Sequence, residues 1–165
     1  MAQIFISLGS SIKREYHVKQ GIHSLARAFS VSIDELSLSS LFESEAVGFR
    51  GENFYNMVIG IHCAYSVDKV AAILRDIEYT FGRSEHPEKY SPRTLDLDLL
   101  LYDDLVIDKP VQLPRDEIDK NAFVLWPLSE IAPEITHPIL HDNYASLWKN
   151  YNKQTQYLKR IPRCW

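Results

Sequence analysis

The sequence of 165 residues has little cysteine, no long apolar run and no excess of positive charge. Its two cysteines, Cys63 and Cys164, are too few for a disulfide framework and lack the spacing of metal ligands. No apolar run approaches the roughly 20 residues that a membrane-spanning helix needs. The N-terminus leads directly into a strand pattern without signal-peptide features. We therefore expect a cytoplasmic protein with no membrane partner.

Positive charge is scarce because 18 lysines and arginines stand against 22 aspartates and glutamates, for a formal net charge of −4. A general nucleic-acid binder needs a basic surface, so we expect no nucleic-acid partner. One nucleotide in a local basic pocket is compatible with this charge. A chain of this length can bury one core, and we expect a single domain over residues 1–165 that is a monomer.

Apolar residues alternate between strand and helix spacing along the chain. Period-two patterns predict strands over residues 3–8, 33–42, 57–63 and 95–101, and helical spacing predicts helices over 18–29 and 67–81. Ser66 is expected to cap the second helix and Gly82 to end it. This order predicts an α+β fold, a ferredoxin-like αβ sandwich in which an antiparallel sheet has helices packed on it.

Two weaker patterns complete the fold prediction. Asp103 and Asp104 predict a turn from the 95–101 strand into a short hairpin strand over residues 105–107. The basic run over residues 159–163 is expected to be a solvated tail.

Asp96 and Asp98 lie within a run of alternating leucines at positions 95, 97, 99 and 101. On a strand the leucines share one face, and the two carboxylates point together off the other, about 7 Å apart at the backbone. Neighbouring carboxylates repel each other, and a cation between them removes that cost. Mg²⁺ takes one or two carboxylates plus substrate phosphates, and Arg93 is suited to hold a phosphate. The alternative is a half-buried edge strand whose polar face carries two aspartates.

The same run closely resembles the signature of the hydroxymethyldihydropterin pyrophosphokinases, Pro-Arg-x-x-Asp-x-Asp followed by aliphatic residues. Here it reads Tyr90-Ser91-Pro92-Arg93-Thr94-Leu95-Asp96-Leu97-Asp98-Leu99-Leu100. Residues 6–11 are similar to the opening strand and Gly-Ser-Asn turn of that family, and residues 123–128 resemble its Phe-x-Leu-x-Pro-Leu segment. The three matches occur in the family's order.

The resemblance implies a folate-pathway enzyme with a specific reaction. Pyrophosphate passes from ATP to the hydroxymethyl group of 6-hydroxymethyl-7,8-dihydropterin, giving AMP and the pterin diphosphate. Two Mg²⁺ ions are implied on Asp96 and Asp98, and catalytic roles are implied for these aspartates with Arg83 and Arg93.

The resemblance also implies the substrate-binding residues. For ATP they are Glu78, Arg83, Tyr90, Arg93 and Leu99, and Lys109 and Arg115 are expected to bind it from shifted positions, in place of family cations that this chain lacks. Those for the pterin are Ser44, Val47, Phe54, Asn56 and Phe123, in which the two phenylalanines sandwich the ring and the asparagine binds its edge. The segments 44–53 and 83–92 are expected to close over the ligands.

Several positions depart from the family pattern around the nucleotide. Glu85 stands where many members carry an arginine, Arg115 and Asp116 stand where a His-Tyr pair is common, and Asn121 replaces an arginine. Each lost charge-assisted contact costs about 1.5–3 kcal/mol. We expect an active enzyme with a remodelled nucleotide site.

Two other hypotheses remain open from the sequence. A non-catalytic pterin- or nucleotide-binding module would have kept the fold but lost phosphoryl transfer, although such a module has no need of Asp96 and Asp98. An RNA-binding domain on the same sandwich would need exposed aromatic and basic residues on its central strands, which the acidic strand does not offer.

Overall fold

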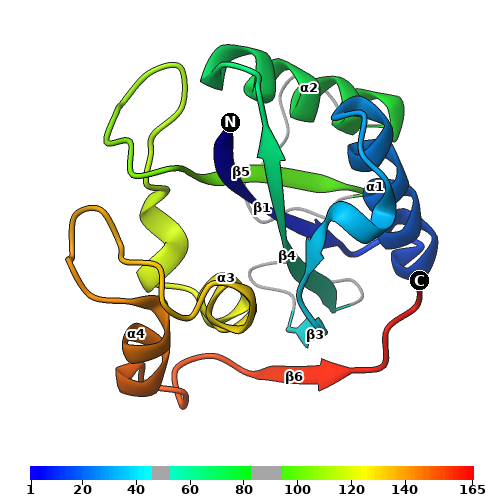
Figure 1. Ribbon diagram of the computed structural model, residues 1–165. Helices are drawn as coiled ribbons and strands as arrows, with labels where there is room; N and C mark the ends of the chain where they lie inside the picture. The colour runs from blue at the N-terminus through cyan, green and yellow to red at the C-terminus, as the bar shows by residue number, and fades with distance from the viewer. Residues whose placement is uncertain (46–52, 83–93) are drawn as a thin grey trace.

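The computed structural model describes residues 1–45, 53–82 and 94–165. Its centre is an antiparallel sheet in the order β5-β1-β4-β3-β6, with β2 paired to β4 (Figure 1). The strands are β1 (Ala2–Ser10), β2 (Ser37–Leu38), β3 (Leu41–Ser44), β4 (Phe54–Cys63), β5 (Asp96–Tyr102) and β6 (Leu158–Ile161). The helices are α1 (Arg14–Ala28), α2 (Val67–Thr80), α3 (Ala122–Ile131) and α4 (Tyr144–Asn150), with 3-10 turns at Ile33–Glu35 and Asp116–Asp119.

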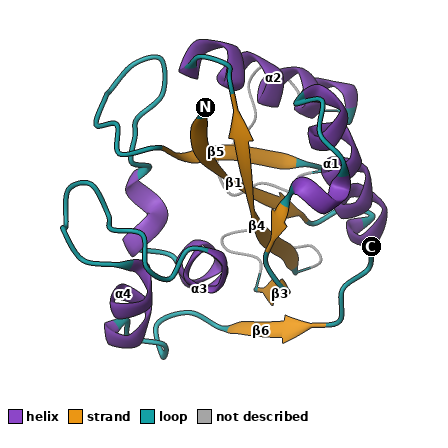
Figure 2. Cartoon of the chain, in the orientation of Figure 1, coloured by secondary structure: helices purple, strands orange, loops and turns teal. Residues whose placement is uncertain are grey.

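Helices cover both faces of the sheet, α1 and α2 on one side and α3 with α4 on the other (Figure 2). Alternate residues of β1 divide between the two cores. Ile4 and Ile6 are buried with residues of α1 and α2 in the first core, whereas Phe5 is buried with residues of α3 in the second. The predicted α+β sandwich, an antiparallel sheet with helices packed on it, is confirmed.

The boundaries of α2 follow the predicted signals. The side chain of Ser66 accepts a hydrogen bond from the backbone N–H of Lys69 at 3.2 Å, which satisfies one of the free donors of the first turn. After the last helical residue, Gly82 has a φ of 98°, a conformation that side-chain-bearing residues rarely adopt. Local sequence therefore sets both ends of this helix.

The predicted strand over residues 33–42 is wrong in its first half. Ser32 and Glu35 form a capping box, and this reciprocal bonding stabilises a 3-10 turn in place of extended chain. Two short strands follow it. Leu36 and Leu41 belong to the first core, whereas the ring of Phe42 packs 4.7 Å from that of Trp126 in α3, on the opposite face.

The expectation that all four leucines of the 95–101 run share a face fails at its last member. Leu99 pairs with Ile6, and Leu101 pairs with the next residue of β1, Phe5, so Leu100 is an extra residue in β5. Such a β-bulge reverses the alternation that follows it. Leu97 and Leu99 therefore lie in the first core, and Leu100 and Leu101 lie in the second.

Two further expectations about the second half of the chain are wrong. Asp103 does turn the chain, with a φ of 49°, but Ile107 then pairs with Leu113 and not with β5. The C-terminal run is not a solvated tail, because β6 pairs with β3 and Arg160 forms a 2.7 Å ion pair with Glu130. Among the helices of the described segments, none combines the length and apolar character required to span a membrane.

Candidate functional site

The two predicted carboxylates lie on the sheet face that α3 partly covers. In the strand register Asp96 is opposite Gly9 and Asp98 is opposite Ser7, and Gly9 is in turn opposite Asn56. Residues directly opposite in an antiparallel sheet point to the same face. We call the group on this face the polar patch, which consists of Ser7, Gly9, Ser44, Asn56, Asp96 and Asp98.

Gly9 leaves a position without a side chain in the middle of this patch. A Cβ atom added there would lie 3.4 Å from Oδ1 of Asn56 and 3.7 Å from the ring of Phe54. Two strand spacings separate Asn56 from Asp96 across this glycine, which amounts to about 10 Å. The amide and the carboxylates therefore stand at opposite ends of the patch, with no side chain at Gly9 between them.

Asp96 and Asp98 are half-buried, while Leu95, Leu97 and Leu99 are buried on the opposite face, as the alternation predicts. Carboxylate oxygens suit Mg²⁺, which usually completes its shell with substrate phosphates and water. No group of three or more histidine, cysteine or acidic side chains that could hold a metal occurs among the described residues. Two carboxylates suit an ion whose remaining ligands are substrate phosphates and water.

Arg115 lies against this pair. Its Nη2 is 3.3 Å from Oδ1 of Asp98, and its Nε is 3.9 Å from Oε2 of Glu117. Its backbone N–H donates a 2.9 Å hydrogen bond to the carbonyl of Leu100, so the segment after β5 folds back along that strand. The sequence suggested Arg115 only as a displaced phosphate ligand, because nothing in the pattern of residues 103–115 reveals this return.

Glu78 lies beneath the start of β5. Its side chain, on the last turns of α2, is 2% exposed, and Oε2 accepts a 2.9 Å hydrogen bond from the backbone N–H of Leu97. Leu97 stands between the two aspartates. The carboxylate of Glu78 thus fixes the main chain that carries them, and its direct contact with ATP stays a prediction.

Three of the expected pterin ligands, Ser44, Phe54 and Asn56, lie together at the other end of the polar patch. Nδ2 of Asn56 donates a 2.8 Å hydrogen bond to Oγ of Ser44, and both residues are buried. Phe54 precedes Asn56 by two residues on β4 and so shares its face, half-buried. Phe123 is half-buried in the first turn of α3, which packs against β3 and β4.

The remaining expected residues divide into two groups. Leu99 is 4% exposed with its side chain in the first core, so only its main chain can face a nucleotide, and Lys109 is exposed in the loop after β5. The others lie outside the described residues: Val47, Arg83, Tyr90 and Arg93. The same applies to most of the two segments expected to close over the ligands.

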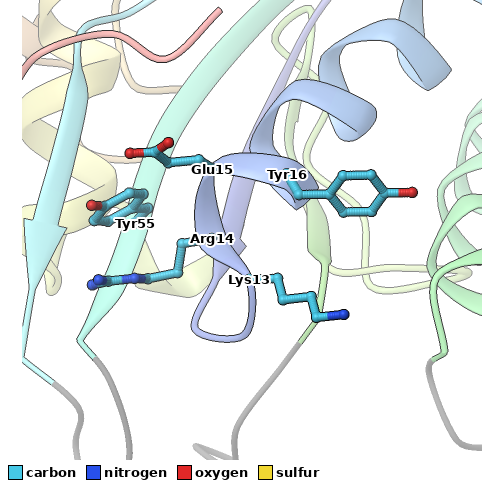
Figure 3. Close-up of a pocket in the computed structure, with 5 residues that line it drawn as sticks. All are labelled: Lys13, Arg14, Glu15, Tyr16 and Tyr55. Atoms are coloured by element: carbon cyan, nitrogen blue, oxygen red, sulfur yellow. The ribbon is translucent and has the colours of Figure 1, made fainter.

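A cavity of about 590 Å³ opens at the start of α1, lined by Lys13, Arg14, Glu15, Tyr16 and Tyr55 (Figure 3). Tyr55 lies between Phe54 and Asn56 on β4, so its ring points to the opposite face from the polar patch. Arg14 extends over this ring at 4.2 Å and donates 3.0 Å hydrogen bonds to Glu43 and to the carbonyl of Asn53. These contacts tie α1 to β3 and β4, and nothing in the sequence predicted this cavity.

Known proteins of one family are similar to this chain in sequence. Residues 5–133 match the family described as 7,8-dihydro-6-hydroxymethylpterin-pyrophosphokinase (HPPK). The chain is similar to the 2-amino-4-hydroxy-6-hydroxymethyldihydropteridine pyrophosphokinase of Aquifex aeolicus, 32% identical over 142 residues that cover 84% of this chain and 86% of that protein. The protein of the same name from Bacillus subtilis is 30% identical over 134 residues, covering 79% and 78%.

A solved structure of wild-type Plasmodium falciparum HPPK-DHPS with pteroate has a TM-score of 0.71 at 13% identity. The match covers 97% of this chain and 46% of that longer chain, and at this identity it shows a shared fold alone. The family match and the relatives confirm the resemblance found in the sequence. The chain belongs to the 7,8-dihydro-6-hydroxymethylpterin-pyrophosphokinase family.

Proposed function

We propose that this chain transfers pyrophosphate from ATP to the hydroxymethyl group of 6-hydroxymethyl-7,8-dihydropterin, giving AMP and the pterin diphosphate in folate biosynthesis. Family membership and the names of the relatives support this reaction. The observation that carries the proposal is the polar patch itself. It has Asp96 and Asp98 at one end and Asn56 about 10 Å away across Gly9.

Asn56 is suited to bind the edge of the pterin. Its Nδ2 is occupied by Ser44, so Oδ1 is the group left to present toward the open position above Gly9. An amide oxygen at that place accepts a hydrogen bond from a ring N–H or amino group of the pterin. Phe54, whose ring borders the same position, and Phe123 offer apolar surface for the flat ring.

Asp96 and Asp98 would hold Mg²⁺, and we propose two ions there. When bound, these ions neutralise charge on the polyphosphate and polarise its phosphorus. The residues of the chain hold the reacting groups in position. Glu78 fixes the backbone between the two aspartates, and Arg115 places a guanidinium beside them. Arg83 and Arg93 stay proposed phosphate ligands.

The reaction needs no covalent intermediate on the protein. The hydroxymethyl oxygen forms a bond to the β-phosphorus, the bond from that phosphorus to the AMP oxygen breaks, and the hydroxyl proton is released. Holding the two substrates in line accounts for much of the rate in such transfers. We further propose one domain that acts as a cytoplasmic monomer on these two small molecules.

Release of AMP tests the proposal directly. Purified protein with ATP and Mg²⁺ should release AMP when 6-hydroxymethyl-7,8-dihydropterin is added, and chelation of the metal should stop the release. The control omits the pterin and measures background hydrolysis. AMP that does not rise above this background on adding the pterin would refute the enzyme assignment.

One observation favours a second candidate, a non-catalytic pterin-binding module. Arg115 lies 3.3 Å from Asp98, so the chain itself supplies a charged partner for this carboxylate. Calorimetry separates the two functions. The enzyme binds a non-hydrolysable ATP analogue only with Mg²⁺, whereas the module binds the pterin without either.

A further inference from the structure

The segment over residues 151–161, which follows α4, contacts two separate parts of the expected pterin site (Figure 1). Its first half bonds to the start of α3, the helix that carries Phe123. Its second half contains β6, which pairs with β3 as far as Ser44. The family match ends at residue 133, so this segment lies beyond it. The helix and the strand that carry expected pterin ligands therefore share one neighbouring segment.

The first turn of α3 is capped by a side chain of this segment. The helix lies wholly within the described residues, and the side chain of Asn121 before it accepts no hydrogen bond from its backbone. Oε1 of Gln156 instead accepts a 2.7 Å hydrogen bond from the backbone N–H of Ala122, and its Nε2 donates a 2.9 Å bond to Oδ1 of Asn121. The first N–H groups of a helix have no partner within the helix. Gln156 therefore fixes the turn in which Phe123 stands.

The second half of the segment holds β3 against α3. The pairing of β6 with β3 extends to Ser44, whose Oγ accepts the hydrogen bond from Nδ2 of Asn56. On β6, Arg160 forms a 2.7 Å ion pair with Oε2 of Glu130 in α3. Oε1 of Glu130 accepts a 2.7 Å hydrogen bond from the backbone N–H of Ser40, just before β3. The bonds of one short segment thus link α3 to the strands at the pterin end of the polar patch.

We propose that Gln156 is a positioning residue for pterin binding. It fixes the first turn of α3, so that the ring of Phe123 is held in place relative to Asn56 and one flat ligand can contact both. Without Gln156 the N–H of Ala122 loses its partner and the first turn opens more readily. Only the molecules in which this turn is closed then bind the pterin at full affinity. The inference rests on the proposed function for the identity of the ligand, and adds a residue that neither the sequence pattern nor the family resemblance indicated.

The test is calorimetry of the full chain with 6-hydroxymethyl-7,8-dihydropterin, at saturating Mg²⁺ and non-hydrolysable ATP analogue. Gln156→Ala should bind the pterin about three- to tenfold more weakly than the wild type, the range expected from losing a helix cap. Affinity for the ATP analogue, measured without the pterin, should not change, because Phe123 is expected to contact the pterin alone. A general loss of stability would not separate the two ligands in this way.

Three further variants control this measurement. Gln154→Ala removes the same side chain from an exposed position two residues earlier and should bind the pterin like the wild type. Gln156→Glu keeps an oxygen for the N–H of Ala122, and a carboxylate is favourable at a helix N-terminus, so this variant should keep wild-type affinity. Gln156→Asn keeps the amide on a side chain one carbon shorter. It should weaken pterin binding, and it serves if Gln156→Ala does not fold.

A double-mutant cycle tests whether Gln156 acts through Phe123. Phe123→Leu replaces the aromatic ring by a smaller aliphatic side chain and leaves pterin binding measurable. Adding Gln156→Ala to this variant should lower pterin affinity by a clearly smaller factor than in the wild type, because two residues that act together are not additive.

The positioning role is overturned by unchanged pterin affinity in the folded Gln156→Ala or Gln156→Asn variant, by equal weakening of both ligands, or by full additivity in the cycle. The same holds if Gln156→Glu binds as weakly as Gln156→Ala, or if Gln154→Ala loses as much. A wild type that binds the pterin and releases AMP but gives one of these results keeps the proposed function and loses the role of Gln156. A wild type that does not bind the pterin at all overturns both.

Discussion

The two faces of the central sheet come from the same strands and differ in what they bury. The face beneath α1 and α2 is apolar along β1 and β5, with Ile6, Leu8, Leu97 and Leu99 all buried. The opposite face is apolar only beneath α3 and carries the polar patch beyond it. Packing energy therefore comes from the whole of the first face, which leaves part of the second for binding.

The bulge in β5 marks the boundary between these two uses of one face. Before Leu100 the strand directs Asp96 and Asp98 to the second face, and after it Leu101 joins the core under α3. By plain alternation Leu100 would lie on the second face and Leu101 on the first, whereas the bulge places both leucines on the second face. The extra residue thus adds Leu101 to the apolar core that lies under α3 on the same face as the polar patch.

The strongest test of this comparison changes two neighbouring residues on opposite faces. Asp96→Asn should lower turnover at least about 100-fold, the loss of a metal ligand being worth several kcal/mol, with little change in the free energy of unfolding. Leu97→Ala should instead cost about 2–5 kcal/mol of stability and leave turnover per folded molecule much closer to the wild type. Urea titration and initial rates of AMP release measure both. Equal loss of activity in the two folded variants would contradict the division of roles.

A second test concerns Glu78, whose side chain extends from α2 to the backbone of β5 between the two aspartates. Glu78→Ala leaves the buried N–H of Leu97 unpaired and should cost about 1–3 kcal/mol of unfolding free energy. Glu78→Gln keeps a carbonyl oxygen for this bond and should cost less. If Glu78 also contacts ATP, the glutamine variant will lose nucleotide affinity while remaining stable. Denaturation and titration with an ATP analogue distinguish these contributions.

Two glycines allow the same small change on each face. At Gly9 an added methyl group enters the open position of the polar patch, and Gly9→Ala should weaken pterin binding about tenfold, or 1.4 kcal/mol, with little effect on stability. At Gly21 in α1 the methyl would lie 2.7 Å from Cδ1 of Leu8 in the first core. Gly21→Ala should destabilise by about 1–3 kcal/mol from overpacking, reduced by the helix preference of alanine, and leave pterin affinity unchanged. Calorimetry with the pterin and urea unfolding would show the two effects separately.

Much of this arrangement could be predicted from the sequence where the signal is local. The alternation of leucine and aspartate before position 99 shows which side chains share a face, and Ser66 with Gly82 shows where α2 begins and ends. The bulge could not be predicted, because Leu99, Leu100 and Leu101 are all apolar and satisfy either face. The strand β6 was missed because Leu158 and Ile161 are its only apolar residues.

Two contacts at the site join segments that are distant in sequence, and no local sequence pattern predicts them. Arg115 comes back to Asp98 after a loop of irregular chain, and Glu78 reaches Leu97 from the preceding helix. Glu78 was expected near the nucleotide from the resemblance and Arg115 as a compensating cation, yet their bonds to β5 were not expected. Sequence thus predicted that Asp96 and Asp98 share a face, while tertiary packing determines which charged groups bond to their strand.

The smallest predicted effect compares two tyrosines on the α3 side of the sheet. Tyr144 is fully buried in the second core, and its hydroxyl has no hydrogen-bond partner in the described part of the chain. Tyr144→Phe removes this unsatisfied group and should raise the free energy of unfolding by up to about 1 kcal/mol. Tyr151→Phe is the control, because its hydroxyl donates a 2.8 Å bond to the carbonyl of Lys120 and its loss should destabilise by about 0.5–1.5 kcal/mol.

The difference in stability between the wild type and Tyr144→Phe should depend on pH. Burial raises the pKa of Tyr144 far above its usual range, so the folded protein keeps the phenol neutral where the unfolded chain ionises it, above about pH 10. Below that pH the phenol is neutral in both states, so its contribution to the free energy of unfolding does not change with pH. Above it, each pH unit should lower the free energy of unfolding of the wild type by about 1.4 kcal/mol relative to Tyr144→Phe. Urea midpoints at pH 8 and at pH 11 measure the difference. An advantage of the phenylalanine variant that does not grow between these pH values would mean that the hydroxyl reaches water, and that the core under α3 is less closed than the core under α1 and α2.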